Sequence, residues 1–273
     1  MIGASVSAGV QSLAARNQTG DASADRSSVS LAQAIDACLT VTHGQTKLLA
    51  DQAMVFDANG SLHRQVAVAL ALKPTVVFAI DSLFWTAYAP ADAPAERVRR
   101  LEDALATLDR IDVPLVVGNL PDMRGSVAAA LGDRAAVNEV ERCALNERIR
   151  AWASQRPRVA FILLDELVTE VRAGESIDLG RAQIDARDVA GLLSADGLHL
   201  TPEGQVALAT LALSSLAMHG VIPAEAIRAN PRISRAILRE QASRDVGQAP
   251  SGGGESTIAR AHASLAFSRS QKS

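Results

Sequence analysis

Three continuous apolar runs, separated by stretches of helical periodicity, restrict the folds open to this chain more than any other feature. The runs cover residues 75–80, 113–117 and 158–164, and a weaker fourth covers residues 53–56. Runs without polar alternation are typical of strands that are covered on both faces. The spacing of apolar residues predicts helices over residues 62–72, 95–111, 137–155 and 201–219. Together these patterns predict a parallel sheet covered by helices.

The composition is that of a globular domain with a sizeable core. Of the 273 residues, 48% are hydrophobic and 21% are charged, and the net charge of -3 is too small to indicate a nucleic-acid partner. No stretch of about twenty uninterrupted apolar residues occurs, which excludes a membrane span. The two cysteines, Cys38 and Cys143, cannot by themselves form a disulfide framework or a thiolate metal site, and their helical contexts predict small buried side chains.

Charge and composition divide the chain into a body and a carboxyl-terminal region. Residues 228–273 contain eight basic and three acidic residues, so the remainder is acidic. We expect one domain over residues 1–243, with a core over 1–220 and a basic helical extension over 221–243. A short amphipathic helix is predicted from residue 231 to 244, and docking on the acidic body is favoured over binding to a membrane surface or a partner. The Gly- and Ser-rich residues 244–273 are expected to be disordered.

The amino terminus has the pattern of a strand end, a tight turn of small residues and a helix start over residues 1–9. The strand that should precede this turn is missing, so we expect that an amino-terminal segment has been lost. No signal peptide is visible, and the sequence as it stands predicts a cytoplasmic protein. The lost segment could, however, have carried a secretion signal.

Two short motifs carry candidate chemistry. The first is Gly3-Ala4-Ser5 in the amino-terminal turn, and the second is the Asp-x-x-His motif from Asp196 to His199, which directly precedes a helix start at Thr201-Pro202-Glu203. In order, separation and context these motifs resemble those of the SGNH, or GDSL-type, serine ester hydrolases, over about residues 1–220. The resemblance implies a flavodoxin-like, three-layer α/β/α domain with a mostly parallel sheet.

The resemblance also implies a catalytic triad. Ser5 would be the nucleophile, His199 the base that removes its proton, and Asp196 the acid that orients the imidazole. Ser7 is a rival nucleophile, but no glycine directly precedes it at the spacing of the motif. The alternative is structural, with Ser5 capping a helix and His199 fixing a loop; the combination of the motifs favours catalysis.

An ester hydrolase also needs donors for the oxyanion of the tetrahedral intermediate. In the resembled family these are the nucleophile's amide, a glycine amide after the second strand and an asparagine after the third. Gly60, with Asn59 as a helper, matches the glycine, although Asn-Gly is also an ordinary turn. At the asparagine position this chain has Asp81, and an ionised carboxylate would repel an oxyanion.

Three solutions to the Asp81 problem are open. A dry site could keep Asp81 protonated, so that it donates a hydrogen bond. Asn119, which directly follows the next strand, could replace it as donor, and we favour this solution. Alternatively, the domain could be a weak catalyst that acts mainly by binding. Three aromatic residues close to Asp81 are expected either to line an acyl or sugar pocket or to pack against a helix: Phe84, Trp85 and Tyr88.

The sequence therefore predicts a hydrolase that acts on a small-molecule ester through an acyl-enzyme, with no cofactor, no metal and no nucleic-acid partner. Two alternatives remain. One is an acyltransferase that uses the same groups, and the other is a non-catalytic binding module.

Overall fold

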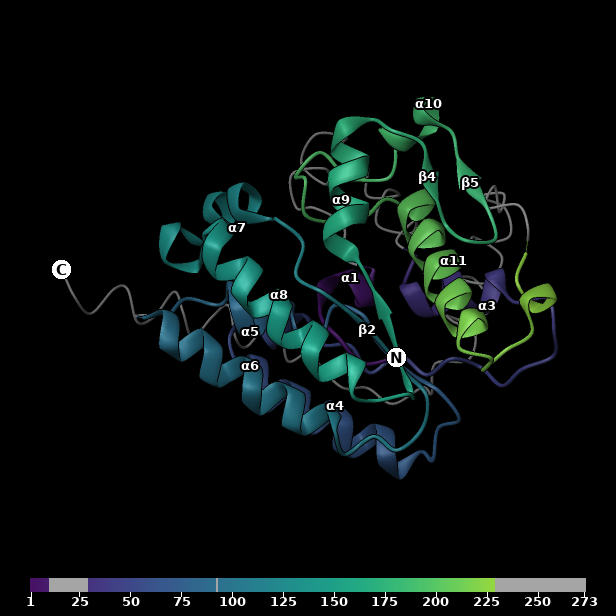
Figure 1. The fold of residues 1–273 in the computed structure, drawn as a ribbon, viewed down its shortest axis with the longest axis horizontal. Coiled ribbons are helices and arrows are strands. Elements are labelled where there is room, and N and C mark those ends of the chain that lie inside the picture. The colour runs from purple at the N-terminus through teal and green to yellow at the C-terminus, as the bar shows by residue number, and fades with distance from the viewer. Residues whose placement is uncertain (10–28, 92, 229–273) are drawn as a thin grey trace, which may run out of the picture. The chain divides into compact units, whose positions relative to one another are not determined.

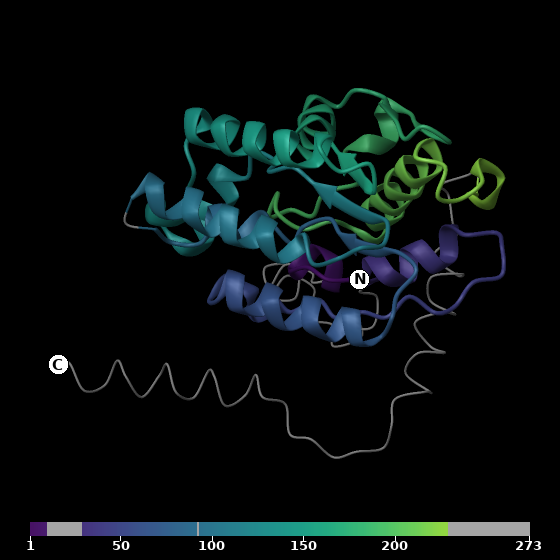
Figure 2. The same ribbon diagram turned by 60° about the horizontal axis from the view of Figure 1, so that its bottom comes forward.

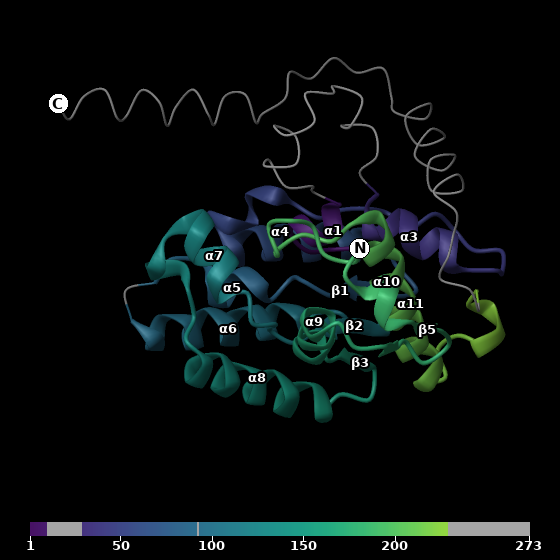
Figure 3. The same cartoon turned by 90° about the horizontal axis from the view of Figure 1, so that it is seen from above.

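A parallel sheet forms the centre of the computed structural model, which describes residues 1–9, 29–91 and 93–228. Its strands are β1 (Val77–Ala79), β2 (Leu115–Gly118) and β3 (Val159–Ile162), in the order β1-β2-β3 (Figure 3). Each strand lies within one of the three predicted runs, so these predictions are confirmed. A short antiparallel pair follows, β4 (Ile177–Asp178) and β5 (Gln183–Ile184).

The described residues contain ten α-helices and belong to one compact unit. The four predicted helices are confirmed as α4 (Ala58–Ala71), α6 (Pro94–Leu108), α8 (Glu139–Ser154) and α11 (Pro202–Met218). The others are α1 (Ser5–Ala8), α3 (Leu31–Cys38), α5 (Phe84–Tyr88), α7 (Arg124–Leu131), α9 (Leu164–Ala173) and α10 (Ala186–Val189). None of the described helices is both long enough and apolar enough to cross a membrane.

The weak fourth strand, predicted over residues 53–56, is wrong. Gln52–Val55 form a 3-10 helix, and the side chain of Asp57 then accepts a hydrogen bond from the Gly60 amide and caps α4. Because this cap begins a helix four residues before the predicted start, the chain turns where a strand would have to continue.

Helices pack on both faces of the sheet. In β2, Val116 belongs to a core cluster with α3, α9 and α11, whereas Leu115 and Val117 belong to a second cluster with α4, α6 and α8. This alternation follows from the two-residue period of a strand. Figure 1 shows α4, α6 and α8 on one side of β2, and α3, α9 and α11 on the other.

Two extended segments continue the backbone ladder beyond β1. The bonds run from Ile2 N to Phe78 O (2.9 Å), from Leu49 N to Met1 O (2.8 Å) and from Asp51 N to Gly3 O (3.0 Å). Residue numbers increase in the same direction along residues 1–3 and 49–51, so these two segments run parallel. The order across the ladder is therefore residues 49–51, residues 1–3, β1, β2 and β3. Helix α1, in purple beside the amino end in Figure 2, follows the segment of residues 1–3.

The helix predicted over residues 231–244 and the tail predicted over 244–273 lie outside the described residues.

The two cysteines differ in exposure. Cys38 is buried in α3 as expected, but the prediction for Cys143 is wrong, because it lies on the exposed face of α8. That helix buries its neighbours Arg142 and Leu145 instead.

Candidate active site

A single tight turn carries both Asp196 and His199. The turn is closed by a β-bridge between Leu193 and Leu200 and by a hydrogen bond from Ser194 N to the His199 carbonyl (2.8 Å). Gly197 lies within it at φ 63°, a left-handed conformation that other residues adopt at a cost. The Asp-x-x-His motif is thus a local structure with a fixed backbone.

The His199 imidazole and the Asp196 carboxylate form a close pair. His199 Nδ1 lies 2.7 Å from Asp196 Oδ2, and Asp196 Oδ1 accepts bonds from the amides of Leu198 and His199, each at 3.0 Å. Burial raises the pKa of Asp196, but the hydrogen bonds from the His199 ring and the two amides outweigh it, so the pKa lies below its ordinary value. An ionised Asp196 takes the proton-bearing Nδ1 as its donor and leaves Nε2 as the free acceptor.

Ser5 is the first residue of α1 and follows a glycine that nothing larger can replace. A Cβ on Gly3 would lie 2.1 Å from Asp81 Oδ1, and the φ of Gly3 is 148°. The hydrogen bonds of the described residues engage the amides of Ala4 and Ser7 but not that of Ser5. The Ser5 amide at this helix start is therefore a candidate donor to a bound oxygen.

The Asp81 carboxylate holds this first turn in place. It accepts bonds from Ala4 N (3.1 Å), Ser7 N (3.1 Å) and Ser7 Oγ (2.6 Å). Burial raises the pKa of Asp81, while the bonds from Ser7 and Ala4 oppose the rise. Asp81 is thus an acceptor for α1, and the rival nucleophile Ser7 is fully buried with its hydroxyl committed to Asp81.

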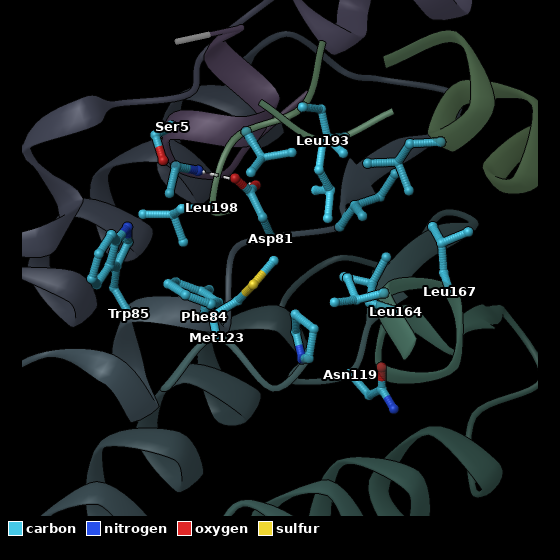
Figure 4. Close-up of a pocket in the computed structure, with 17 residues that line it drawn as sticks. Ser5, Asp81, Phe84, Trp85, Asn119, Met123, Leu164, Leu167, Leu193 and Leu198 are labelled. Carbon is cyan, nitrogen blue, oxygen red and sulfur yellow. Dashed lines mark hydrogen bonds between the residues drawn. The ribbon is translucent and has the colours of Figure 1, made fainter. Parts of the chain in front are cut away.

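Ser5 and Asp81 line a largely apolar pocket at the carboxyl end of β1 (Figure 4). Asn119, which directly follows β2, lines the same pocket at the opposite end of this view from Ser5. Asn119 Oδ1 accepts a bond from Asp165 N (2.9 Å), and no hydrogen bond of the described residues engages Nδ2. Asn119 is therefore brought to the pocket with its donor group uncommitted.

The other predicted oxyanion donors lie elsewhere. Gly60 N donates to Asp57 Oδ1 (3.0 Å) in the first turn of α4. Asn59 Nδ2 donates to the Arg100 carbonyl (2.9 Å) and to Asp103, both on α6. Neither residue is among those that line the Ser5 pocket. The structure does not bring Asn59 or Gly60 to Ser5.

The three aromatic residues divide between the two expected roles. Phe84 and Trp85 line the pocket. Tyr88 is fully buried behind them, where its hydroxyl donates to the Pro121 carbonyl (2.7 Å) and accepts from Met123 N (3.1 Å). Burial raises its pKa to about 12. Tyr88 supports a pocket-lining loop without lining the pocket itself.

Sequence reasoning missed most of the pocket wall. Leu164, Leu167 and Val168 of α9 line it, as does Leu198, which lies inside the Asp-x-x-His motif. The apolar spacing of α9 would predict ordinary core residues, because a helix that packs on a sheet and one that lines a cavity have the same periodicity.

Ser5 lines this pocket, whereas His199 does not, although its neighbours Leu198 and Leu200 do. Ser5 lies in its wall beside Leu198, the neighbour of His199, but the hydrogen bonds of the described residues include none between Ser5 and His199. Such bonds are often long in the absence of substrate. Within the described part of the chain, no group of three or more His, Cys, Asp or Glu side chains could hold a metal ion.

Comparisons of the chain with protein-family models, with curated proteins and with solved structures gave no match.

Proposed function

We propose that this protein is a serine hydrolase of the SGNH type that cleaves ester bonds through an acyl-enzyme on Ser5. The observation that carries the proposal is the Asp196–His199 pair, held at 2.7 Å in the turn whose residue Leu198 lines the Ser5 pocket. A carboxylate, an imidazole that it orients and a half-buried serine at a helix start are the groups that acyl transfer requires.

The backbone ladder supports the flavodoxin-like assignment within this proposal. If residues 1–3, residues 49–51, β1, β2 and β3 are numbered 1 to 5 along the chain, their order across the sheet is 2-1-3-4-5. This is the order of flavodoxin-like sheets, in which ligands bind at the carboxyl ends of the strands beside the first. Ser5 follows the first segment at that edge. We place the catalytic core in residues 1–220.

In the proposed mechanism, His199 accepts and returns a proton in each of two half-reactions. His199 Nε2 removes the proton of the Ser5 hydroxyl as its oxygen attacks the ester carbon, and Asp196 stabilises the imidazolium that forms. The imidazolium returns the proton to the departing alcohol. The same imidazole then takes a proton from water as the water oxygen attacks the acyl carbon, and it returns this proton to the Ser5 oxygen as the acid leaves. The Ser5 amide is the proposed donor to the oxyanion.

Covalent labelling tests the nucleophile. We expect a fluorophosphonate probe to label the purified protein and labelling to disappear in Ser5→Ala, because only the activated hydroxyl attacks phosphorus. In-gel fluorescence and mass spectrometry of the labelled peptide measure this. Ser154→Ala, on the exposed end of α8, is the matched control and keeps full labelling. Undiminished labelling of Ser5→Ala would show that another residue is the nucleophile.

The pH dependence tests the base. We expect kcat/KM to rise with pH between about 5 and 8, because the imidazole must be neutral to accept a proton. The pKa of Asp196 lies below its ordinary 3.8, so Asp196 stays ionised throughout this window and does not cause the loss of activity at low pH. Initial rates in buffers of constant ionic strength measure the profile. A flat profile would argue against His199 as the base.

One observation favours a binding module as a second candidate function. Asp81 occupies the position of an oxyanion donor in the resembled family, yet it accepts all three of its bonds from α1. In this alternative the protein would bind acylated ligands without cleaving them, and the wild-type protein would resist the fluorophosphonate probe.

A further inference from the structure

We propose that Gln205 is a positioning residue, whose side-chain amide fixes the helix that carries Ser5 against the helix that follows His199. This inference rests on the proposed function of those two residues. Gln205 lies in the first turn of α11, which begins at Pro202, and its side chain is buried. Its Nε2 donates to the carbonyl of Val6 in α1 at 2.7 Å. The bond therefore joins the two elements on which the nucleophile and the base depend.

Helix α1 is too short to hold its own position. It has four residues, and the side chain of its N-cap residue, Ala4, makes no capping hydrogen bond. A single helical turn is not stable by itself, because forming it fixes several residues in return for very few hydrogen bonds. The position of Ser5 therefore depends on side chains that bind the turn from other elements.

Three side chains bind this turn or the residue before it in the part of the chain that the structure describes. Asp81 holds the start of α1 through the three bonds given above. Gln65 of α4 accepts from Gly3 N (2.6 Å) and donates to the Gly3 carbonyl (3.0 Å). The third side chain is that of Gln205. Of the three, it alone belongs to the element that follows His199.

The backbone of Gln205 is tied to the turn of His199. Gln205 N donates to the Thr201 carbonyl (2.9 Å), and Thr201 N donates to the Leu192 carbonyl (3.0 Å). The start of α11 also packs closely on this turn, since a Cβ on Gly204 would lie 2.1 Å from Leu192 O. The start of α11 and the His199 turn are thus one unit, and the side chain of Gln205 joins this unit to α1.

The bond to Val6 is not needed to satisfy a buried group. Gly9 N also donates to the Val6 carbonyl (3.1 Å), and Gln205 Oε1 is buried without a partner among the described residues. An apolar side chain of similar length at position 205 would remove this unpaired acceptor and leave the Val6 carbonyl with one donor. We therefore expect the loss of Gln205 to affect the placement of α1 more than the stability of the fold.

The substitution Gln205→Met tests this role, because methionine is of similar length but cannot donate to the Val6 carbonyl. We expect kcat for p-nitrophenyl acetate to fall about tenfold, since a small displacement of a nucleophile from its base slows the reaction strongly. KM should stay within about twofold, because Gln205 does not line the Ser5 pocket. The rate of fluorophosphonate labelling should fall in the same proportion as kcat.

The matched control is Thr210→Val, which removes another buried polar group from α11. The Thr210 hydroxyl donates to the Val206 carbonyl of the same helix (2.9 Å) and does not bond α1. This variant should keep kcat within about twofold of the wild type. Urea denaturation gives the folded fraction of each variant, to which kcat is referred.

Gln205→Glu supplies a donor that depends on pH. A neutral glutamic acid can donate to the Val6 carbonyl, whereas an ionised one repels it, and burial favours the neutral form. We expect the ratio of kcat in this variant to kcat in the wild type to fall as the pH rises from about 5 to 8. The corresponding ratio for Gln205→Met should stay constant, because methionine does not titrate. If Gln205→Met does not fold, the pH series of Gln205→Glu decides the question.

The outcomes separate this inference from the function on which it rests. Wild-type kcat in Gln205→Met, with activity lost in Ser5→Ala, would overturn the positioning role and leave the hydrolase intact. A loss of activity that only follows the loss of folded protein, with no pH dependence of the Gln205→Glu ratio, would also overturn it. A wild-type protein that neither hydrolyses the ester nor reacts with the probe would overturn both proposals.

Discussion

Replacing His199 by alanine is expected to lower kcat for ester hydrolysis by about 10³-fold or more, with little change in KM. His199 lies in the turn whose residue Leu198 lines the Ser5 pocket, and it is paired with Asp196 at 2.7 Å. Without the imidazole, the Ser5 hydroxyl loses the base that the proposed mechanism assigns to it. Steady-state kinetics with a soluble ester at pH 8 measure the loss.

The control for this substitution is His63→Ala. His63 lies on α4, is about half exposed and pairs with Asp103 at 3.6 Å, so its removal should leave kcat within twofold. Asp196→Asn should also reduce kcat strongly, because an amide no longer fixes the Nδ1 proton. A His199→Ala variant that keeps wild-type kcat would show that the pair has a structural role and that the triad is misassigned.

Asp81→Asn is the second substitution with a large expected effect. The direction of the change in kcat distinguishes two roles for this position. If Asp81 occupies the place of an oxyanion donor, restoring asparagine should raise kcat. The geometry predicts the opposite. The Asp81 carboxylate accepts from two amides and the Ser7 hydroxyl, and asparagine would put an N–H₂ group against one of these donors. We expect kcat to fall by about tenfold or more and the protein to lose about 1–3 kcal/mol of stability.

Asp81→Ala should be more destabilising, because it leaves all three donors without their acceptor in a buried site. Chemical denaturation measures the free energy of unfolding, and kcat and KM are compared on the fraction that is folded. Asp112→Asn, at an exposed loop position before β2, is the matched control. An increase in kcat for Asp81→Asn would contradict the assignment of Asp81 to α1.

Much of the fold follows from the sequence because its signals are local. The runs that became β1, β2 and β3 are apolar on both faces, and a strand buried on both faces has no other pattern. The start of α11 was predictable because Thr201 accepts from Gly204 N (3.1 Å), a cap that a Thr-Pro start indicates. By contrast, β4 and β5 have two residues each, too few for any periodicity.

The candidate site was only partly predictable, because its parts depend on long-range contacts to different degrees. The Asp196–His199 pair lies within one turn, so the spacing of the two residues in the sequence was enough to predict it. The partner of Asp81 lies 74 residues away at Ser7, and nothing in the local sequence around Asp81 indicates it. Likewise, the Asn59-Gly60 pair resembles a site motif, but Asp57 captures the Gly60 amide within the same helix turn. Tertiary geometry decided these roles.

The unequal reach of these contacts also has a consequence for how the site assembles in time. The bonds between Asp196 and His199 span three residues, whereas the α1 turn that carries Ser5 depends on Asp81, 74 residues from Ser7, and on Gln205, which donates to the Val6 carbonyl across 199 residues. Short loops close quickly and long ones slowly. During refolding we therefore expect the Asp196–His199 pair to form before Ser5 reaches its final position. Activity is expected to return as the last step.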